Sequence, residues 1–147
     1  MSATPAPQPQ DSQTVAERQL CGLVTGLARQ IADHVRERAA RLDLTAPQAT
    51  ALRELTGPMT MKELAERMTC EPSNATFVVD KLEKQGFVER RPHPADRRAK
   101  QLVLTPEGAA LRARLVGLLV EGGPLSGLDE GELEQLQELL RRAAAQH

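Results

Sequence analysis

The chain has 147 residues and a formal net charge of −1, with 40% hydrophobic residues but only two Phe, no Trp and no Tyr. This length is typical of one domain with a real core, and the aliphatic composition favours helices. Two cysteines without a CxxC pair argue against a disulfide scaffold and a zinc finger. No apolar run approaches transmembrane length and no signal peptide is recognisable, so we expect a cytoplasmic protein and no membrane partner.

The N-terminal part divides into a tail and a long helix. Residues 1–13 alternate Pro with small polar residues and bury little apolar area, so we predict a flexible Pro-rich tail. Over residues 14–42, apolar side chains recur every three or four positions, as at Leu20, Val24 and Leu27. This spacing predicts a long amphipathic helix. Its apolar stripe needs a covering surface, and a partner subunit is the natural candidate.

Three helices are predicted between Thr45 and Gly86. Thr45 and Thr60 are suited to cap the first two, and Glu63 completes a capping box for the second. Pro72 fits the first position of the third helix, which ends where Gly86 can adopt a left-handed conformation. The predicted helices span residues 47–55, 61–68 and 72–85. A tight turn joins the second and third, which is the outline of a helix-turn-helix.

A basic hairpin follows the helix-turn-helix. Residues 87–91 and 101–104 alternate like two short strands around a tip that contains His93. From Lys84 to Lys100 there are six Lys or Arg against two acids, while the rest of the chain has a net charge of −5. Positive charge gathered on one projecting element is what a phosphate backbone selects, although a solvated basic loop has the same composition.

Two more helices complete the chain. Thr105 and Pro106 predict the start of one helix, and Asp129 the start of another after a Gly- and Pro-containing break over residues 121–126. The last helix again has a one-sided leucine stripe, which includes Leu133. The predicted fold class is therefore mainly α, a winged helix-turn-helix with a short β-hairpin wing between amphipathic helices at both ends.

The most specific sequence pattern is D-x-R followed by L-x-L-T-x-x-G, formed by Asp96, Arg98, Leu102, Leu104, Thr105 and Gly108. With the helix-turn-helix before it, this pattern closely resembles the MarR family of bacterial transcription regulators. The resemblance implies a homodimer on double-stranded DNA, with one helix of each subunit in the major groove and the wing in the neighbouring minor groove. It also implies a single MarR-like domain over residues 14–147, in which residues 45–104 form the winged helix-turn-helix and residues 14–42 and 105–147 form the dimerisation helices.

DNA-contacting residues can be assigned on this basis. Short polar side chains in the first turn of the helix in the major groove are predicted to read base edges: Ser73, Asn74 and Thr76. Phosphate contacts, which set affinity and register, are expected of Lys81, Lys84, Arg90 and Arg91. We expect Arg98 in the minor groove, steadied by Asp96, with Arg97 beside it. Many relatives have a basic residue where this chain has Phe77; we expect Phe77 to pack against the neighbouring helix, with a thymine-methyl contact as the alternative.

The resemblance also implies a small-molecule effector, often an anionic aromatic, bound between the dimer helices and the winged domain. Because the chain has no Tyr or Trp, such a site would consist of Leu, Val and Met, with His34 or Arg38 as the polar group. The segment around Cys21 resembles the reactive-cysteine segment of the family's organic-hydroperoxide-sensing repressors, in which tyrosines help to organise the site. We expect Cys21, like Cys70, to be a small buried side chain, with a peroxide-sensing thiol as the alternative for Cys21.

Other function classes have weaker support in the sequence. There is no glycine-rich phosphate loop and no HExxH motif, and the histidines and cysteines are too dispersed for a metal site. We therefore expect no enzyme activity, no cofactor and no metal. A winged helix that contacts another protein is the remaining alternative, and the basic wing argues against it.

Overall fold

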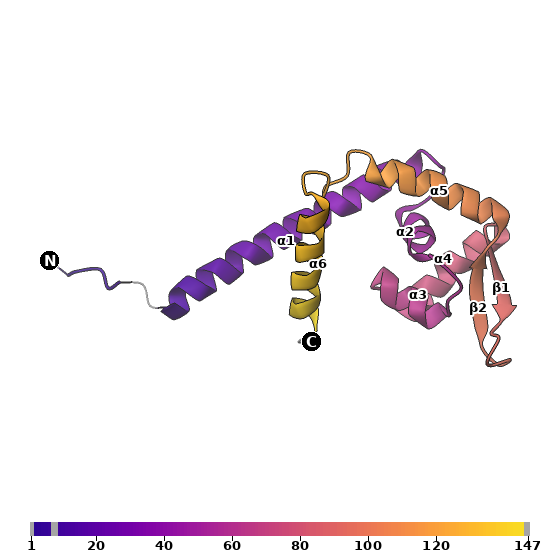
Figure 1. Ribbon diagram of the computed structural model, residues 1–147, viewed down its shortest axis with the longest axis horizontal. Helices are drawn as coiled ribbons and strands as arrows, with labels where there is room; N and C mark the ends of the chain where they lie inside the picture. Colours follow the sequence, from indigo (N-terminus) through magenta and orange to yellow (C-terminus); the bar gives the residue numbers. More distant parts are fainter. Residues whose placement is uncertain (1, 7–8, 146–147) are drawn as a thin grey trace.

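The computed structural model describes residues 2–6 and 9–145, so residues 1, 7 and 8 of the predicted tail and residues 146–147 of the last predicted segment lie outside the described residues. Within the described part, helices and one antiparallel pair of strands follow in the order α1 (Pro9–Ala40), α2 (Ala46–Glu54), α3 (Met61–Met68), α4 (Pro72–Lys84), β1 (Val88–Pro92), β2 (Lys100–Leu104), α5 (Pro106–Val120) and α6 (Glu130–Ala144). Figure 1 shows α2–α5 and the strands gathered at one end of α1, whose N-terminal half extends away from them. The predicted winged helix-turn-helix is confirmed.

The core lies where α2, α3, α4 and α5 meet the wing. Its largest fully buried side chains are aliphatic: Leu52, Leu55, Leu64, Leu82, Leu102, Leu115, Val79 and Val88. Burying each such side chain stabilises the fold by about 1.5–3 kcal/mol, so a core without Tyr or Trp can still hold the winged part together. Of the two phenylalanines, Phe87 is half-buried against this core.

Threonine caps start the helices as predicted. Thr45 accepts a hydrogen bond from the Gln48 backbone N–H at 3.3 Å, and the Gln48 side chain accepts one from the Thr45 N–H at 2.9 Å. Thr60 accepts from the Glu63 N–H at 3.2 Å. The reciprocal half of the predicted box at Thr60 is not formed between these two described residues. One capped N–H contributes about 1 kcal/mol to helix stability, so the half-formed box still fixes the start of α3.

The end of α4 is the predicted left-handed glycine. Gly86 has φ +83°, a conformation that glycine adopts without a steric cost. The Phe87 N–H donates to the Leu82 carbonyl at 2.9 Å, and the Gly86 N–H donates to the Glu83 carbonyl at 3.0 Å. This pair of bonds is a Schellman motif, which satisfies the last carbonyls of α4 and turns the chain into β1.

The T-x-x-G part of the sequence pattern fixes α5 to the corner between α4 and β1. The Thr105 hydroxyl donates to the Gly86 carbonyl at 2.6 Å and accepts from the Gly108 N–H at 3.0 Å. The Thr105 N–H donates to the Phe87 carbonyl at 3.1 Å. A Cβ on Gly108 would lie 1.9 Å from that carbonyl oxygen, so only glycine allows the approach.

The wing is an antiparallel hairpin in which Val88 pairs with Leu104 and Pro92 with Lys100. A third chain segment joins it, because Met59 and Leu102 exchange backbone hydrogen bonds of 3.3 and 2.7 Å. This bridge was not predicted from the sequence. It ties the wing to the segment just before α3, so β2 is paired with β1 on one side and with Met59 on the other.

The first helix is longer at its N-terminus than predicted, because α1 begins at Pro9 rather than at residue 14. The part of the predicted tail from residue 9 to residue 13 is therefore helical. Proline is tolerated in the first turn of a helix, and Asp11 interacts favourably with the positive end of the helix dipole there. At the other end the helix stops at Ala40, short of residue 42, and Asp43 takes a left-handed φ of 57° in the turn that follows.

The terminal helices leave large apolar side chains uncovered. On α1, the end of α5 and α6, the exposed ones are Val15, Leu20, Leu23, Val24, Val120, Leu133, Leu139 and Leu140. No residue of α6 is buried within the described chain. None of the described helices combines the length and the apolar character needed to cross a membrane.

Candidate nucleic-acid interface

The helix α4 has one face in the core and one in solvent. Ala75, Val78, Val79 and Leu82 are buried, and their spacing follows the helical repeat. Ser73 and Asn74, in the first turn, are exposed and offer free side chains to a ligand. Thr76 is half-buried, and its hydroxyl donates to the Pro72 carbonyl at 2.9 Å. The predicted base-reading residues are thus at the open end of α4, but Thr76 retains only acceptor capacity.

The expectation that Phe77 packs against a neighbouring helix is wrong. Phe77 is 63% exposed, because it lies two residues from both Ala75 and Val79 and therefore points away from the face that they bury. The Lys81 ammonium lies 4.5 Å from the centre of its ring, a cation–π contact on the solvent side of α4. Phe77 and Lys81 therefore share the surface that carries Ser73 and Asn74.

Two of the predicted phosphate-contacting arginines are engaged within the chain. The Arg90 guanidinium on β1 forms an ion pair with Asp80 of α4 and lies 3.5 Å from a carboxylate oxygen of Glu83. Arg91 pairs with Glu89 of the same strand at 2.8 Å. Asp80 and Glu83 were not among the predicted site residues, because they precede the segment whose charge was counted. The Arg90 contacts tie the wing to α4, and both arginines have part of their charge neutralised within the chain.

The unpaired positive charge of the basic segment lies at the tip of the wing and at the end of α4. Between Lys84 and Lys100, all of which the structure describes, four exposed cations have no ion-pair partner: Lys84, Arg97, Arg98 and Lys100. Asp96 accepts a hydrogen bond from the Arg98 backbone N–H at 3.0 Å, so it fixes the tip backbone rather than the Arg98 guanidinium. The guanidinium of Arg98 remains available to an external anion.

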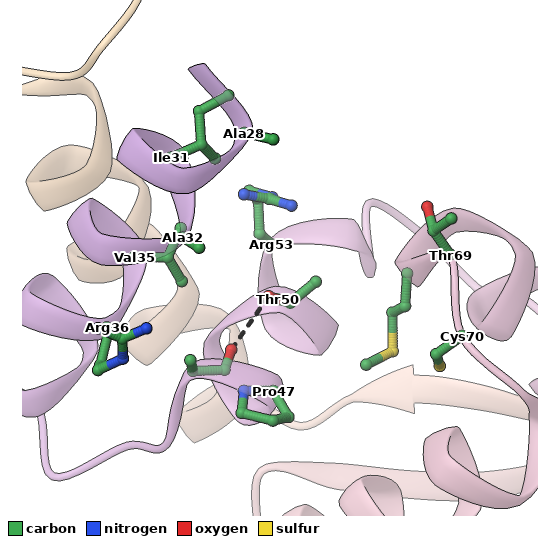
Figure 2. Close-up of a pocket in the computed structure, with 12 residues that line it drawn as sticks. Ala28, Ile31, Ala32, Val35, Arg36, Pro47, Thr50, Arg53, Thr69 and Cys70 are labelled. Carbon is green, nitrogen blue, oxygen red and sulfur yellow. Dashed lines mark hydrogen bonds between the residues drawn. The ribbon is translucent and has the colours of Figure 1, made fainter. Parts of the chain in front are cut away.

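A cavity of about 640 Å³ lies between α1, α2 and the end of α3. Figure 2 shows Ile31 and Val35 of α1 on one side and Thr69 and Cys70 on the other, with Arg53 between them. Its walls are mostly aliphatic, in a chain that has no Tyr or Trp. Its cations are Arg36, which pairs with Asp33 at 2.9 Å, and Arg53, which pairs with Glu54 at 3.0 Å. No sequence signal had distinguished these two arginines from the rest of the polar surface.

His34 and Arg38, predicted as polar groups of an effector site, do not line this cavity. His34 Nε2 lies within hydrogen-bond distance of the Leu119 carbonyl oxygen, at 2.8 Å. Arg38 donates to the Leu118 carbonyl at 3.0 Å and to the Glu121 carbonyl at 3.1 Å. Both side chains therefore satisfy the free carbonyls at the end of α5 and hold it on α1, a contact between residues far apart in the sequence.

The expected burial of Cys21 is also wrong for this chain. Cys21 is exposed, because it lies in the half of α1 that extends beyond the winged part. Cys70, which we also expected to be buried, is only half-buried, because it lines the open cavity beside α3. Among the described residues, no three His, Cys, Asp or Glu side chains are grouped closely enough to hold a metal ion.

The pKa of one carboxyl on α1 departs from its usual value. A hydrogen bond from Arg41 lowers the pKa of Glu37, and the nearby charges of Arg38, Arg41 and His34 lower it further, while partial desolvation opposes them. Arg41 and Arg38 each lie 2.7 Å from a Glu37 oxygen. This cluster stands beside the contact between α1 and α5, away from the wing.

Comparison with known proteins gives the same fold and a family. Residues 44–100 match the model of the MarR family. The organic hydroperoxide resistance transcriptional regulator of Bacillus subtilis is 28% identical over 84% of this chain and 83% of that protein. The transcriptional regulator BldR from Sulfolobus solfataricus has a TM-score of 0.75 and 26% identity, over 95% of this chain and 99% of that chain.

A mutant MarR from E. coli, solved in complex with operator DNA, has a TM-score of 0.67 and 26% identity, over 85% of this chain and 93% of that one. The matched segment of 44–100 coincides with the helix-turn-helix and most of the wing described above. The winged helix-turn-helix of this chain is therefore a MarR-family domain, and the chain is a DNA-binding transcriptional regulator of the winged-helix class.

Proposed function

We propose that the chain is a homodimeric repressor that binds a pseudo-palindromic operator in double-stranded DNA and is released by a small molecule. In this proposal α4 lies in the major groove, where Ser73, Asn74 and Thr76 face base edges. The wing lies in the adjacent minor groove with Arg98 inserted and Arg97 beside it. Bound in this way over a promoter, the dimer would block polymerase.

One observation carries this proposal, namely the separation of the groups that the chain leaves unsatisfied. From Lys81 to Lys100, five exposed cations without an ion pair are gathered on α4 and the wing, whereas the uncovered apolar side chains lie mainly on α1 and α6. Cations without partners favour a polyanion, and apolar stripes without partners favour another protein surface. A DNA-bound dimer satisfies both kinds of group at once.

The phosphate-contacting set follows from the ion pairs. Lys84 is unpaired among the described residues, and Lys81 holds its ammonium over the Phe77 ring, so both can approach the backbone from α4. We propose that Arg90 and Arg91 act differently from the sequence-based prediction. The contacts of Arg90 with Asp80 and Glu83 hold the wing at a fixed angle to α4, and Arg91 is neutralised by Glu89 on its own strand.

The dimer would form through the terminal helices. The stripe on α6 includes Leu133, Leu139 and Leu140, and the extended half of α1 offers Leu20 and Leu23, none of them covered within the described chain. Burial of these side chains against a second copy contributes about 1.5–3 kcal/mol for each one fully covered. A homodimer also gives the two recognition helices the twofold relation that a pseudo-palindrome requires.

The cavity beside α1 is the proposed effector site. It has the size of a small-molecule pocket, its walls are aliphatic, and Arg36 and Arg53 supply positive charge for an anionic group. It is bounded by α1 on one side and by α2 and the turn before α4 on the other. A ligand that fits better when these elements move apart would shift the dimer away from its DNA-binding geometry.

A second candidate is a peroxide-sensing repressor that uses Cys21, and two observations favour it. The thiol is exposed, and the B. subtilis relative is a regulator of organic hydroperoxide resistance. Attack of the ionised thiol on the O–O bond would give a sulfenic acid and release the alcohol. Dilute cumene hydroperoxide should then release DNA from the wild type and not from Cys21→Ser, whereas equal release or retention by both would exclude this mechanism.

The central test is selection of duplexes from a random library by the full chain, followed by affinity measurements on the enriched sequence. Neutralising about 6 to 10 phosphates should lower affinity by about 10³ to 10⁵ between 50 and 200 mM salt. Asn74→Ala should relax specificity and Arg98→Ala should weaken binding, while Arg141→Ala, which removes a cation from α6, should do neither. Failure to enrich any sequence, or flat salt dependence, would contradict the proposal and favour a protein-contacting winged helix.

A further inference from the structure

Phe77 is the one exposed large apolar side chain of the winged part, residues 45–105, all of which the structure describes. The other exposed apolar side chains lie on α1, on α6 and at the end of α5, where the proposed dimer would cover them. Phe77 lies instead on the solvent face of α4. In the proposed placement of α4, this face is turned towards the DNA.

The ring lies at the centre of the surface that α4 presents. Ser73 precedes it by one helical turn and Lys81 follows it by one turn, so all three share a face. The Lys81 ammonium 4.5 Å from the ring centre holds the ring on the solvent side and leaves a positive charge beside it. An anionic groove can therefore receive the ammonium and the ring together.

The major groove offers few partners to an unsubstituted phenyl ring. Base edges there present nitrogen and oxygen donors and acceptors, with one apolar exception, the C5-methyl group of thymine. We infer that Phe77 is a specificity-determining residue whose ring contacts a thymine methyl group in each half of the operator. This inference rests on the proposed placement of α4 in the major groove, and it adds a residue to the polar base-reading set.

The neighbours of Phe77 make this contact informative. The Thr76 hydroxyl donates its hydrogen bond to the Pro72 carbonyl, so Thr76, next to the ring, can only accept a hydrogen bond from a base edge. Ser73 and Asn74 read donors and acceptors one turn earlier. A methyl contact would then distinguish thymine from cytosine at a position that these polar groups do not reach, and 5-methylcytosine would be accepted there in place of thymine.

The test uses the enriched operator and removes methyl groups from the DNA rather than from the protein. Each thymine is replaced in turn by deoxyuridine, which keeps every hydrogen-bonding group and deletes one methyl. For the wild-type chain, one position per half-site should lose about fourfold in affinity, the equivalent of exposing one methyl group. Phe77→Ala should bind the thymine and deoxyuridine duplexes equally at that position.

Matched variants separate this contact from a general effect on binding. Phe77→Leu keeps an apolar side chain and should retain part of the preference for the methyl group. Ser73→Ala should keep the full preference, because it leaves the ring in place. Since Phe77 is mostly exposed, Phe77→Ala should unfold at the temperature of the wild type, which thermal denaturation checks.

The outcomes distinguish this inference from the function on which it rests. If no duplex is enriched, both fail. If an operator is enriched and bound with steep salt dependence, but deoxyuridine is tolerated at every position, the Phe77 contact alone is overturned. Equal loss of affinity by Phe77→Ala on thymine and deoxyuridine duplexes would also overturn it, because the ring would then act through something other than the methyl group.

Discussion

Leu82 of α4 is fully buried, whereas Leu139 of α6 is 57% exposed, although both lie in amphipathic helices of similar length. The same contrast holds for the two regions as wholes. Apart from Phe77, the winged part buries its large apolar side chains within one chain, while α6 and the extended half of α1 leave theirs exposed. An amphipathic stripe therefore predicts that a helix will pack, but not whether its partner is in the same chain.

The largest expected effect tests the self-contained region. Gly108→Ala would place a Cβ against the Phe87 carbonyl oxygen and push α5 off the corner between α4 and β1. We expect the free energy of unfolding to fall by about 3 kcal/mol or more, measured by urea denaturation. Gly117→Ala, in the same helix but with open space around the new methyl, should instead gain up to about 1 kcal/mol.

The next effect tests the open region. Leu133→Glu replaces an uncovered leucine of α6 with a charge, which the proposed dimer interface would have to bury. The dimer dissociation constant should rise at least about 10-fold in sedimentation experiments, with the isolated winged fold still intact by circular dichroism. Gln135→Glu adds the same charge outside the leucine stripe and serves as the control. Equal sedimentation of both variants and wild type would place the interface elsewhere.

A smaller effect compares two cations that the sequence alone treats alike. Lys84 is free among the described residues, whereas Arg90 is paired with Asp80 and lies near Glu83. Lys84→Gln should therefore reduce the slope of log affinity against log salt by about one per subunit. Arg90→Gln should leave the slope unchanged and lower the free energy of unfolding by about 0.2–1 kcal/mol. A reduced slope for Arg90→Gln would restore it to the phosphate-contacting set.

The smallest expected effect concerns pH. Because the Arg41 hydrogen bond lowers the pKa of Glu37, ionised Glu37 stabilises the fold above the ordinary carboxyl pKa, and this contribution is lost as the pH falls through the lowered value. Wild type should therefore melt slightly above Glu37→Gln at neutral pH and at the same temperature in strong acid. Since Glu37 is exposed, salt should weaken the difference. In an Arg41→Gln background, the effect of Glu37→Gln on the melting temperature should be much smaller.

Much of the winged part was predictable because its signals are local. Thr45, Thr60, Thr105 and Asp129 cap helices within three residues of themselves, and Gly86 ends α4 through bonds to the turn before it. The start of α1 was not predictable in the same way. No strong cap marks it, and the polar residues from 9 to 13 are compatible with both a helix and a loose tail.

The sequence predicted the positive charge of the site and its location, but not which of the charged side chains have partners within the chain. Arg90 meets Asp80 across the corner between α4 and β1, and Arg38 meets the carbonyls of α5 across more than half of the chain. Neither contact has a sequence pattern, because both depend on how elements pack. Cys21 was assigned to the interior for the same reason, whereas the exposure of Phe77 follows from its spacing to Ala75 and Val79 and could have been read from the sequence.

The order of helices, the caps, the wing and the concentration of positive charge were determined by the sequence itself, because each depends on residues close together in the chain. Tertiary structure decided which of those charges remain free and which apolar stripes are covered. These outcomes depend on long-range packing of α4, the wing and α5. Local propensity does not specify such packing, since one helical pattern can be buried by its own chain or left open for another.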